Sequence, residues 1–351
     1  MAGSRPSEDL DAFRREAKSP GDRAVIREIR EAGSRTARER ISDLLDDGSF
    51  VEVDAFVKHR SGDHGMHLHE PLGDGVVAGH GMLDGRRVVC FSQDFAVFSG
   101  TMGEMHARKI CKILELAEKG RLPVIGIWDG DGQRPHEGVT SLGPNGEILD
   151  RLVSCSGKVP ILSIVLGTVS GTSALAAGLS DFVILGRQRG RMFMRSPYVI
   201  PEIISGEVDE DTLGGATHHA SRSGVACMVS ESESGAFDIA AEILSFLPDH
   251  TMAEPPRLST VDKWKRKCKG MGKLVPLDSD RPYDMREVLA EVVDDKRFLE
   301  LFPSYAQNVV VGFARLDGVP VGMVANQPSV LAGCLDIDAS VKAARFIRTC
   351  D

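Results

Sequence analysis

Two glycine-rich turns, each directly after a short apolar run, constrain the fold of this chain more than any other feature. Residues 123–128 (PVIGIW) lead into 129–134 (DGDGQR), and residues 159–166 (VPILSIVL) lead into 167–173 (GTVSGTS). Short apolar runs bounded by turn residues are typical of buried strands. Helical spacing follows each turn and a third apolar run comes next, at 147–152, 174–179 and 181–186. This order predicts an α/β fold, a right-handed ββα or βαβ stack.

The second run requires a test against a membrane span. The 22 residues from Val159 to Ser180 carry no charge, but ten of them are Pro, Ser, Thr or Gly. A spanning helix needs about 20 predominantly apolar residues. The segment is therefore interpreted as a buried strand, a turn and a buried helix.

The part before the first turn predicts helices and a hairpin. Residues 8–33 form a charged helical stretch, and residues 43–52 indicate a helix end, a turn and a strand start. Alternating residues around an LDG turn predict a hairpin over 73–95. Thr101 and Glu104 have the spacing of a capping box, which predicts a helix from there to about Lys119.

A second pattern begins after a linker. Residues 1–255 are predicted to form one domain, 256–280 a linker and 281–351 the start of a second domain. The elements expected in the second domain are helices at 284–293 and 338–350 and strands near 308–315 and 319–326. The strand edges should be unpaired, and alternation predicts an exposed apolar face made of Val309, Val311, Phe313, Val321 and Met323.

Charge and cysteine content exclude several classes of protein. The 351-residue chain has a net charge of −9 and 5% aromatic residues, which argues against a general nucleic-acid binder. Seven cysteines without a CxxC pair exclude a zinc ribbon and a disulfide scaffold. Reduced thiols and a charged N-terminus without an apolar signal core favour a cytoplasmic protein.

Three clusters have a functional and an ordinary interpretation. Four histidines with Asp63 and Glu70 at 57–73 could suggest a metal site, but the segment lacks a regular element and is interpreted as a solvated loop. The basic residues at 257–273 either lie near coenzyme A phosphates or belong to a solvated linker. His106 is interpreted as a packing or surface residue rather than a catalytic one.

The turns permit a specific chemistry. Bare turns at the carboxyl ends of adjacent strands are where open α/β folds bind ligands. Two converging backbone N–H groups form an oxyanion hole, which polarises a thioester carbonyl and stabilises its enolate without a nucleophilic side chain. The alternative is that each turn is only a tight connection with no ligand.

Longer motifs resemble a known family. Arg38–Ile41 (RERI) with LLDDGSFVE, GDGVVAGHGMLDGRRVVCFSQDF with HARKICKILELA, and the segment from Tyr283 to Ile337 are similar to the carboxyltransferase β subunits of biotin-dependent acyl-CoA carboxylases, of the propionyl-CoA and methylmalonyl-CoA carboxylase type. The resemblance runs from about residue 35 to 351. It implies a crotonase-like (ClpP/crotonase) ββα superhelix, with one complete domain and the start of a second.

The resemblance also implies a site. The N-terminal domain would hold the acyl-CoA, with its carbonyl on backbone N–H groups of Gly171 and Thr172. Other residues expected to bind substrate are Gly130, Asp131, Gly132, Gln133, Arg134, Ser170, Arg195 and Ser196. Carboxybiotin would come from a biotin carboxylase or carrier partner and would be held by a C-terminal domain of another subunit. No metal, nucleic acid or membrane is expected.

Three departures from the family pattern fall on the acyl side. Asp131 replaces a glycine in the first turn, Ser170-Gly171-Thr172 replaces Ala-Gly-Gly, and Arg195 and Ser196 are new. A carboxylate near an enolate repels its charge unless it is turned away or paired, and Arg134 or Arg195 could pair with it. The changes imply either an altered acyl substrate or impaired catalysis.

The end of the chain is a further departure. The chain stops at Asp351 inside an expected helix, and the glycine-rich turn on the biotin side is missing. A fragment, a truncated gene or one half of a split enzyme is therefore expected, completed by homo-oligomers or a complementary half. The function expected is carboxyl transfer to the α-carbon of an acyl-CoA. The alternatives are a non-catalytic acyl-CoA-binding or assembly subunit, and a biotin-independent decarboxylase of malonyl-type thioesters.

Overall fold

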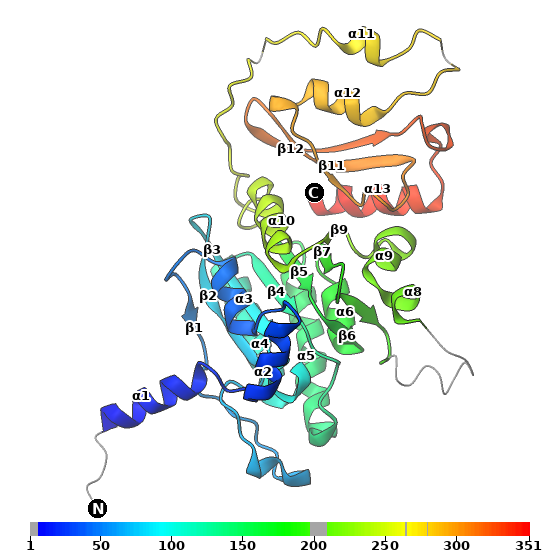
Figure 1. Ribbon diagram of the computed structural model, residues 1–351. Coiled ribbons are helices and arrows are strands. Elements are labelled where there is room, and N and C mark those ends of the chain that lie inside the picture. Colours follow the sequence, from blue (N-terminus) through cyan, green and yellow to red (C-terminus); the bar gives the residue numbers. More distant parts are fainter. Residues whose placement is uncertain (1–5, 197–208, 264, 279) are drawn as a thin grey trace, which may run out of the picture.

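A seven-stranded sheet forms the centre of the molecule (Figure 1). The computed structural model describes residues 6–196, 209–263, 265–278 and 280–351. The strand order is β1-β2-β3-β4-β5-β7-β9. Their bounds are β1 Val51–Glu52, β2 Val76–Leu83, β3 Arg86–Gln93, β4 Val124–Trp128, β5 Ile161–Val165, β7 Phe182–Gly186 and β9 Met228–Ser230.

The sheet combines a hairpin with a parallel part. Strands β1 to β3 are antiparallel, and β2 and β3 form the predicted hairpin around Asp84-Gly85. Strands β3, β4, β5, β7 and β9 run parallel, so β4 and β5 end at the same edge of the sheet. Beyond that edge, β6 (Thr168–Ser170) and β8 (Arg191–Phe193) form a separate parallel pair, which was not predicted.

Helices cover both faces of the sheet. Helices α4 (Glu104–Gly120), α5 (Val139–Cys155) and α6 (Thr172–Gly178) pack with one face, against Val124 and Trp128. Helices α3 (Ala37–Leu44) and α10 (Glu233–Phe246) pack with the other face. The predicted sequence of buried strand, turn and helix is therefore confirmed.

The N-terminal region follows the prediction except at one cap. Residues 8–33 fall in α1 (Pro6–Ala17) and α2 (Arg23–Glu31). The capping box at Thr101 and Glu104 is wrong, because α4 begins after Gly103 and has no side-chain cap from Thr101. Instead the Glu104 N–H donates to the Glu137 carboxylate (2.6 Å). The remaining short elements are η1 Asp63–Leu68, η2 Phe98–Gly100, η3 Pro135–Glu137, α8 Glu210–Gly214, α9 Ala216–His218 and η5 His219–Ser223.

The C-terminal part forms a three-stranded antiparallel sheet with helices. The predicted helices and strands are present, together with four elements that were not predicted (α11, η6, β10 and η7). The set is α11 Met271–Leu274, α12 Met285–Val292, η6 Asp294–Lys296, β10 Leu299–Leu301, β11 Val309–Leu316, β12 Val319–Asn326, η7 Leu331–Gly333 and α13 Ile337–Cys350.

The expectation of an exposed apolar face on this sheet is wrong for β11. Val309, Val311 and Phe313 are each at most 3% exposed. The Phe313 ring stacks on Phe246 of α10, with centroids 5.6 Å apart, so the second part shares the core of the first. Val321 and Met323 of β12 are half-buried.

The second part repeats the geometry of the first hairpin and helix. Positions 76, 100 and 109 correspond to 309, 333 and 342, a constant spacing of 233 residues. Lys109 of α4 donates to the carbonyl oxygens of Gly73 (3.0 Å) and Val76 (2.5 Å). Lys342 of α13 donates in the same way to the carbonyl oxygens of Val309 (2.8 Å) and Phe302 (2.9 Å). Burial lowers the pKa of both lysines to about 8.

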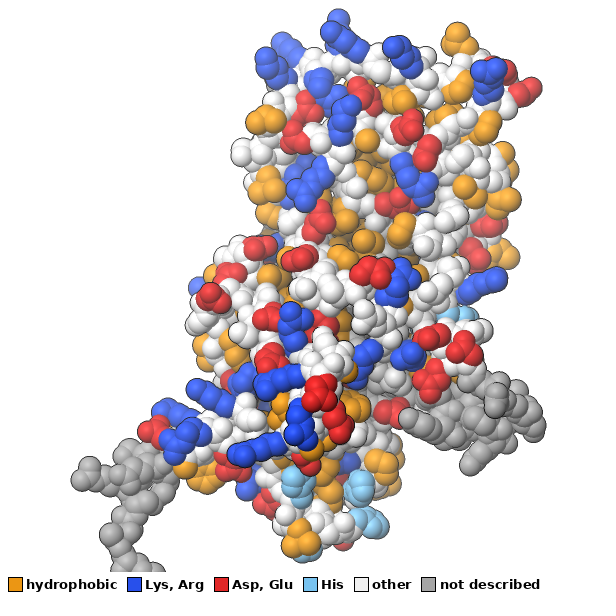
Figure 2. Space-filling view, in the orientation of Figure 1, with side chains coloured by type: hydrophobic (Ala, Val, Ile, Leu, Met, Phe, Trp, Pro, Cys, Tyr) orange, Lys and Arg blue, Asp and Glu red, His pale blue; other side chains and the backbone are white. Residues whose placement is uncertain are grey.

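The basic segment 257–273 lies on the C-terminal part, at the end of the molecule where Figure 2 shows several Lys and Arg side chains. Arg257 pairs with Asp317 (2.6 Å), and Arg266 pairs with Asp262 (2.6 Å). Within this chain the segment therefore lies with the second sheet rather than with the two turns. No helix among the described residues is long and apolar enough to cross a membrane.

Candidate active site

The two glycine-rich turns meet beyond the carboxyl ends of β4 and β5. Gly132 lies so near the second turn that a Cβ there would be 3.0 Å from the Ser170 Oγ. The N–H of Gly132 donates to Gly130 (2.9 Å), which closes the first turn. The predicted juxtaposition of Gly130, Gly132 and Ser170 is therefore present.

The second turn offers one of the two expected donors. The Gly171 N–H donates to the Phe193 carbonyl of β8 (3.1 Å), so this group is committed to the pairing of β6 with β8. The expectation that Gly171 lends its N–H to an oxyanion hole stays a prediction, and in this structure that N–H has an acceptor within the protein. Among the described residues, the Thr172 N–H has no acceptor, and neither has the N–H of Asp131 in the first turn.

Arg134, an expected substrate-binding residue, points into the protein. Its guanidinium is fully buried and pairs with Asp74 (2.6 Å) and Glu137 (2.7 Å). It also donates to the Thr101 carbonyl (3.0 Å) and lies over the Phe98 ring. The charge of Arg134 is therefore compensated inside the protein, where the side chain supports the turn, and its contact with substrate stays a prediction.

Two of the departures from the family pattern contact each other. The Ser196 Oγ donates to the Asp131 Oδ2 (3.1 Å), so the partner of Asp131 is neither Arg134 nor Arg195. The Asp131 Oδ1 is buried and has no hydrogen-bond partner within the described part of the chain. Arg195 is exposed. Gln133 donates to the Gly138 carbonyl (2.8 Å) and the Ser141 hydroxyl (2.6 Å), which fixes the start of α5 rather than a substrate.

A buried ion-pair network below the turns was missed by the sequence analysis. Arg40 of α3 is 1% exposed and pairs with Asp129 (2.7 Å) and with Glu233 of α10 (2.7 Å). Burial alone would lower the pKa of Arg40, but the charges of Asp129 and Glu233 and their hydrogen bonds outweigh it and raise that pKa. The sequence did contain a signal for this network, because Arg40 shares the apolar stripe of α3 with Ala37 and Leu44. A charged residue at such a position is buried and needs a partner of opposite charge.

His106 is buried next to the network of Arg134. Its Nδ1 is 3.1 Å from the Asp74 carbonyl oxygen, and its backbone N–H donates to the Asp74 carboxylate. Burial, with the charges of Arg134 and Lys109, holds the pKa of His106 well below its usual value. These contacts agree with the interpretation of His106 as a packing residue.

The histidine-rich loop gathers no metal site. His59 lies 2.8 Å from the His69 carbonyl oxygen and is buried. Over the described ranges, no three His, Cys, Asp or Glu side chains come together in a way that could hold a metal ion.

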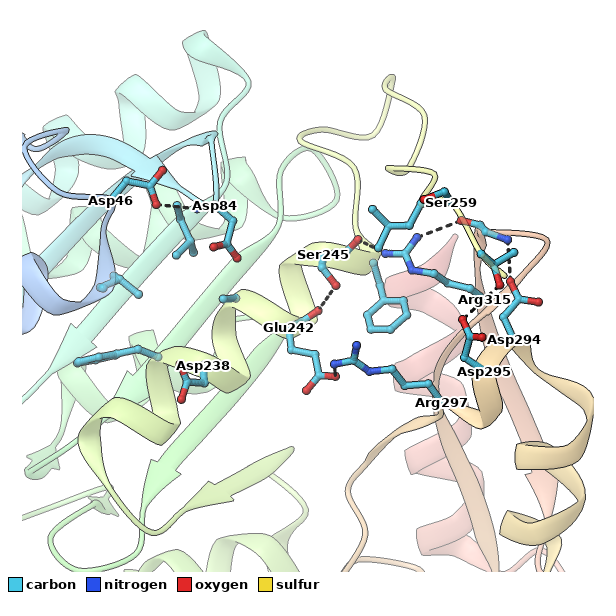
Figure 3. Close-up of a pocket in the computed structure, with 18 of the residues that line it drawn as sticks. Asp46, Asp84, Asp238, Glu242, Ser245, Ser259, Asp294, Asp295, Arg297 and Arg315 are labelled. Atoms are coloured by element: carbon cyan, nitrogen blue, oxygen red, sulfur yellow. Dashed lines mark hydrogen bonds and ion pairs between the residues drawn. The ribbon is translucent and has the colours of Figure 1, made fainter. Parts of the chain in front are cut away.

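A pocket of about 690 Å³ lies elsewhere, between α10 and the C-terminal part (Figure 3). Carboxylates from both sides line it, and Glu242 pairs there with Arg297 (2.9 Å). No residue of the two turns is among those that line it, so this pocket is separate from the candidate active site.

Comparison with known proteins identifies the class. The carboxyl transferase domain model matches residues 28–351, and the chain belongs to this family. It is 44% identical over 350 residues to the biotin-dependent acetyl-/propionyl-coenzyme A carboxylase beta5 subunit of Mycobacterium tuberculosis (strain ATCC 25618 / H37Rv), covering 98% of this chain and 64% of the relative. It is 42% identical over 334 residues to the methylmalonyl-CoA decarboxylase subunit alpha of Veillonella parvula, covering 95% and 66%.

The fold has a close structural counterpart. Transcarboxylase 12S, a hexamer solved with methylmalonyl-coenzyme A bound, superposes with a TM-score of 0.96 at 37% identity, over 100% of this chain and 68% of that one. The predicted crotonase-like α/β fold is confirmed. The chain spans about two thirds of the length of these relatives.

Proposed function

We propose that the chain is the carboxyltransferase component of a biotin-dependent acyl-CoA carboxylase. The observation that carries the proposal is the meeting of the two turns, where the N–H groups of Thr172 and Asp131 have no acceptor among the described residues. Such donors suit a thioester oxygen that gains negative charge. The membership of the carboxyl transferase family and the likeness to the beta5 subunit agree with this chemistry.

In the proposed reaction the turns bind the acyl-CoA and polarise its thioester carbonyl. The backbone donors stabilise the enolate that forms when the α-carbon loses its proton, and the enolate then attacks CO₂. Carboxybiotin from a partner subunit would supply the CO₂ and accept the α-proton on its ureido nitrogen. The described C-terminal part has no second turn of this type, so no residue of this chain is assigned to carboxybiotin.

Isotope exchange at the α-carbon tests the enolate step. With the biotin subunit supplied in deuterated water, acyl-CoA should lose its α-hydrogen at a rate that depends on this chain. Propionyl-CoA is the first substrate to use, because several relatives act on it by name. The absence of both exchange and carboxylation would refute the proposal.

A decarboxylase is the second candidate, because a relative of this chain is named methylmalonyl-CoA decarboxylase subunit alpha. A biotin-independent decarboxylase would release CO₂ from a malonyl-type thioester with the isolated chain alone. A non-catalytic acyl-CoA-binding subunit would bind acyl-CoA in calorimetry without turnover, even with an intact partner.

The seven cysteines are free thiols, which supports a cytoplasmic location.

A further inference from the structure

Asp129 lies between the two turns. It directly follows β4 and is 2% exposed. Its Oδ2 accepts a hydrogen bond from Arg40 (2.7 Å), and its backbone N–H donates to the Gln93 side chain (3.0 Å). Its Oδ1 faces Gly167, where a Cβ would come within 1.7 Å of it. One carboxylate therefore begins the first turn and contacts the residue that begins the second.

Arg40 of α3 fixes this carboxylate. Its guanidinium makes two hydrogen bonds to Glu233 of α10 (2.7 and 3.2 Å) and one to Asp129. The side chains of Arg40 and Asp129 are 1% and 3% exposed, so neither can reorient into solvent. The planar guanidinium is hydrogen-bonded to Glu233 and to Asp129 at the same time, so it leaves the Asp129 carboxylate little freedom to move.

We infer that Asp129, held by Arg40, is a positioning residue that sets the spacing between the two turns. The inference rests on the proposed function, in which donors from both turns share one thioester oxygen. Backbone donors cannot adjust by changing rotamer, so their spacing depends on what holds the turns apart. A displacement of about 1 Å at such a site can cost about 10²-fold in rate.

Three variants test the inference, and a fourth serves as the control. Arg40→Lys keeps the charge but cannot satisfy both carboxylates, and Asp129→Asn removes the charge at nearly constant volume. Gly167→Ala puts a methyl group where the Asp129 oxygen lies. The control is Arg86→Lys, because Arg86 pairs with Asp249 after the other end of α10 and does not contact the turns.

The first readout is amide hydrogen exchange of the full chain, which needs no activity. Peptides covering 129–134 and 167–173 should exchange faster together in each test variant, whereas peptides from α4 stay as in the wild type. Arg86→Lys should change neither turn. Unchanged exchange of the second turn in a folded Arg40→Lys or Asp129→Asn variant would overturn the inference.

The second readout is α-proton exchange from acyl-CoA with the biotin subunit present. The test variants should lose about 10²-fold in kcat while KM changes by less than about threefold, since binding depends on more than the oxyanion contacts. Arg86→Lys should keep both constants. Equal loss in kcat and in acyl-CoA affinity would indicate a merely structural role. If the wild type shows no proton exchange, the proposed function fails, while the amide readout still decides whether Asp129 couples the turns.

Discussion

At the scale of single residues, Asp131 determines which charge the first turn presents. Its Oδ2 accepts a hydrogen bond from Ser196 at 3.1 Å, and its Oδ1 has no partner in the ranges that the structure describes. Asp131 as a whole is half-buried, and its Oδ1 is buried. A carboxylated product near this group would be destabilised by repulsion between like charges.

Asp131→Asn should therefore strengthen the binding of a malonyl-type CoA by about 1 kcal/mol, a several-fold effect, and leave the binding of an uncharged acyl-CoA unchanged. Calorimetry with both ligands measures the difference. Ser196→Ala, which keeps the charge and removes the hydrogen bond, should not discriminate between the ligands. An equal gain for both ligands in Asp131→Asn would contradict a charge effect.

His106 should make the stability depend on pH. The pKa of the folded state lies well below 6.5 because the ring is buried, whereas the unfolded chain has the ordinary value. Below pH 6.5 the unfolded state binds the proton and the folded state does not. As the pH is lowered through this range, the free energy of unfolding should therefore fall by up to about 1.4 kcal/mol per pH unit. Above pH 6.5 this contribution is constant.

Urea unfolding between pH 5 and 8 measures this slope. His106→Asn keeps a donor for the Asp74 carbonyl and should reduce the slope below pH 6.5. The exposed His64, changed to Asn, is the matched control. A slope that is the same in the wild type and His106→Asn would exclude His106 as its source.

At the scale of elements, Glu137 joins the first turn to the start of α4. One carboxylate oxygen accepts the Glu104 N–H and the other pairs with Arg134, which also holds Asp74. Glu137→Ala should lower the free energy of unfolding by about 3–5 kcal/mol, because it leaves a buried ion pair incomplete and α4 uncapped.

Chemical denaturation can compare this variant with Glu147→Ala. Glu147 pairs with Arg151 at 3.3 Å on the surface of α5 and should contribute at most about 0.5 kcal/mol. Glu137→Gln, which keeps an acceptor for the cap, should fall between the two. Similar losses in Glu137→Ala and Glu147→Ala would refute the role of Glu137.

At the scale of the whole molecule, the two parts that the sequence divides into separate domains share one hydrophobic core. Phe182 and Phe246 of the first part surround Phe313 of the second, and Arg345 donates to the Ser180 carbonyl (3.2 Å). The linker at 256–280 is exposed over much of its length. We therefore expect a protease to cut within 256–280 while the two fragments stay together.

Limited proteolysis followed by gel filtration under native conditions measures this. The fragments should co-elute, and Phe313→Ala should weaken their association, whereas Val324→Ala on the exposed side of β12 should not. Fragments that separate in the wild type would show that the two parts are independent domains. Light scattering of the intact chain tests whether its C-terminal part also associates with a second copy, as its predicted unpaired strand edges would allow.

The sequence alone determined the order of elements, because that order depends on local spacing. The apolar runs before residues 129 and 167 specify buried strands, and small residues after them specify tight turns. The hairpin of β2 and β3 follows from alternation around its LDG turn, and the same three residues recur at 316–318, between β11 and β12.

Only the tertiary structure decided which groups face the site. The Gly171 N–H is taken by β8, and Arg134 turns inward to Asp74, which lies 60 positions earlier in the chain. Arg40 reaches Asp129 across 89 positions and Glu233 across 193. Each of these polar groups must find a partner once buried, and the choice of partner depends on how distant segments pack, which local sequence spacing does not specify.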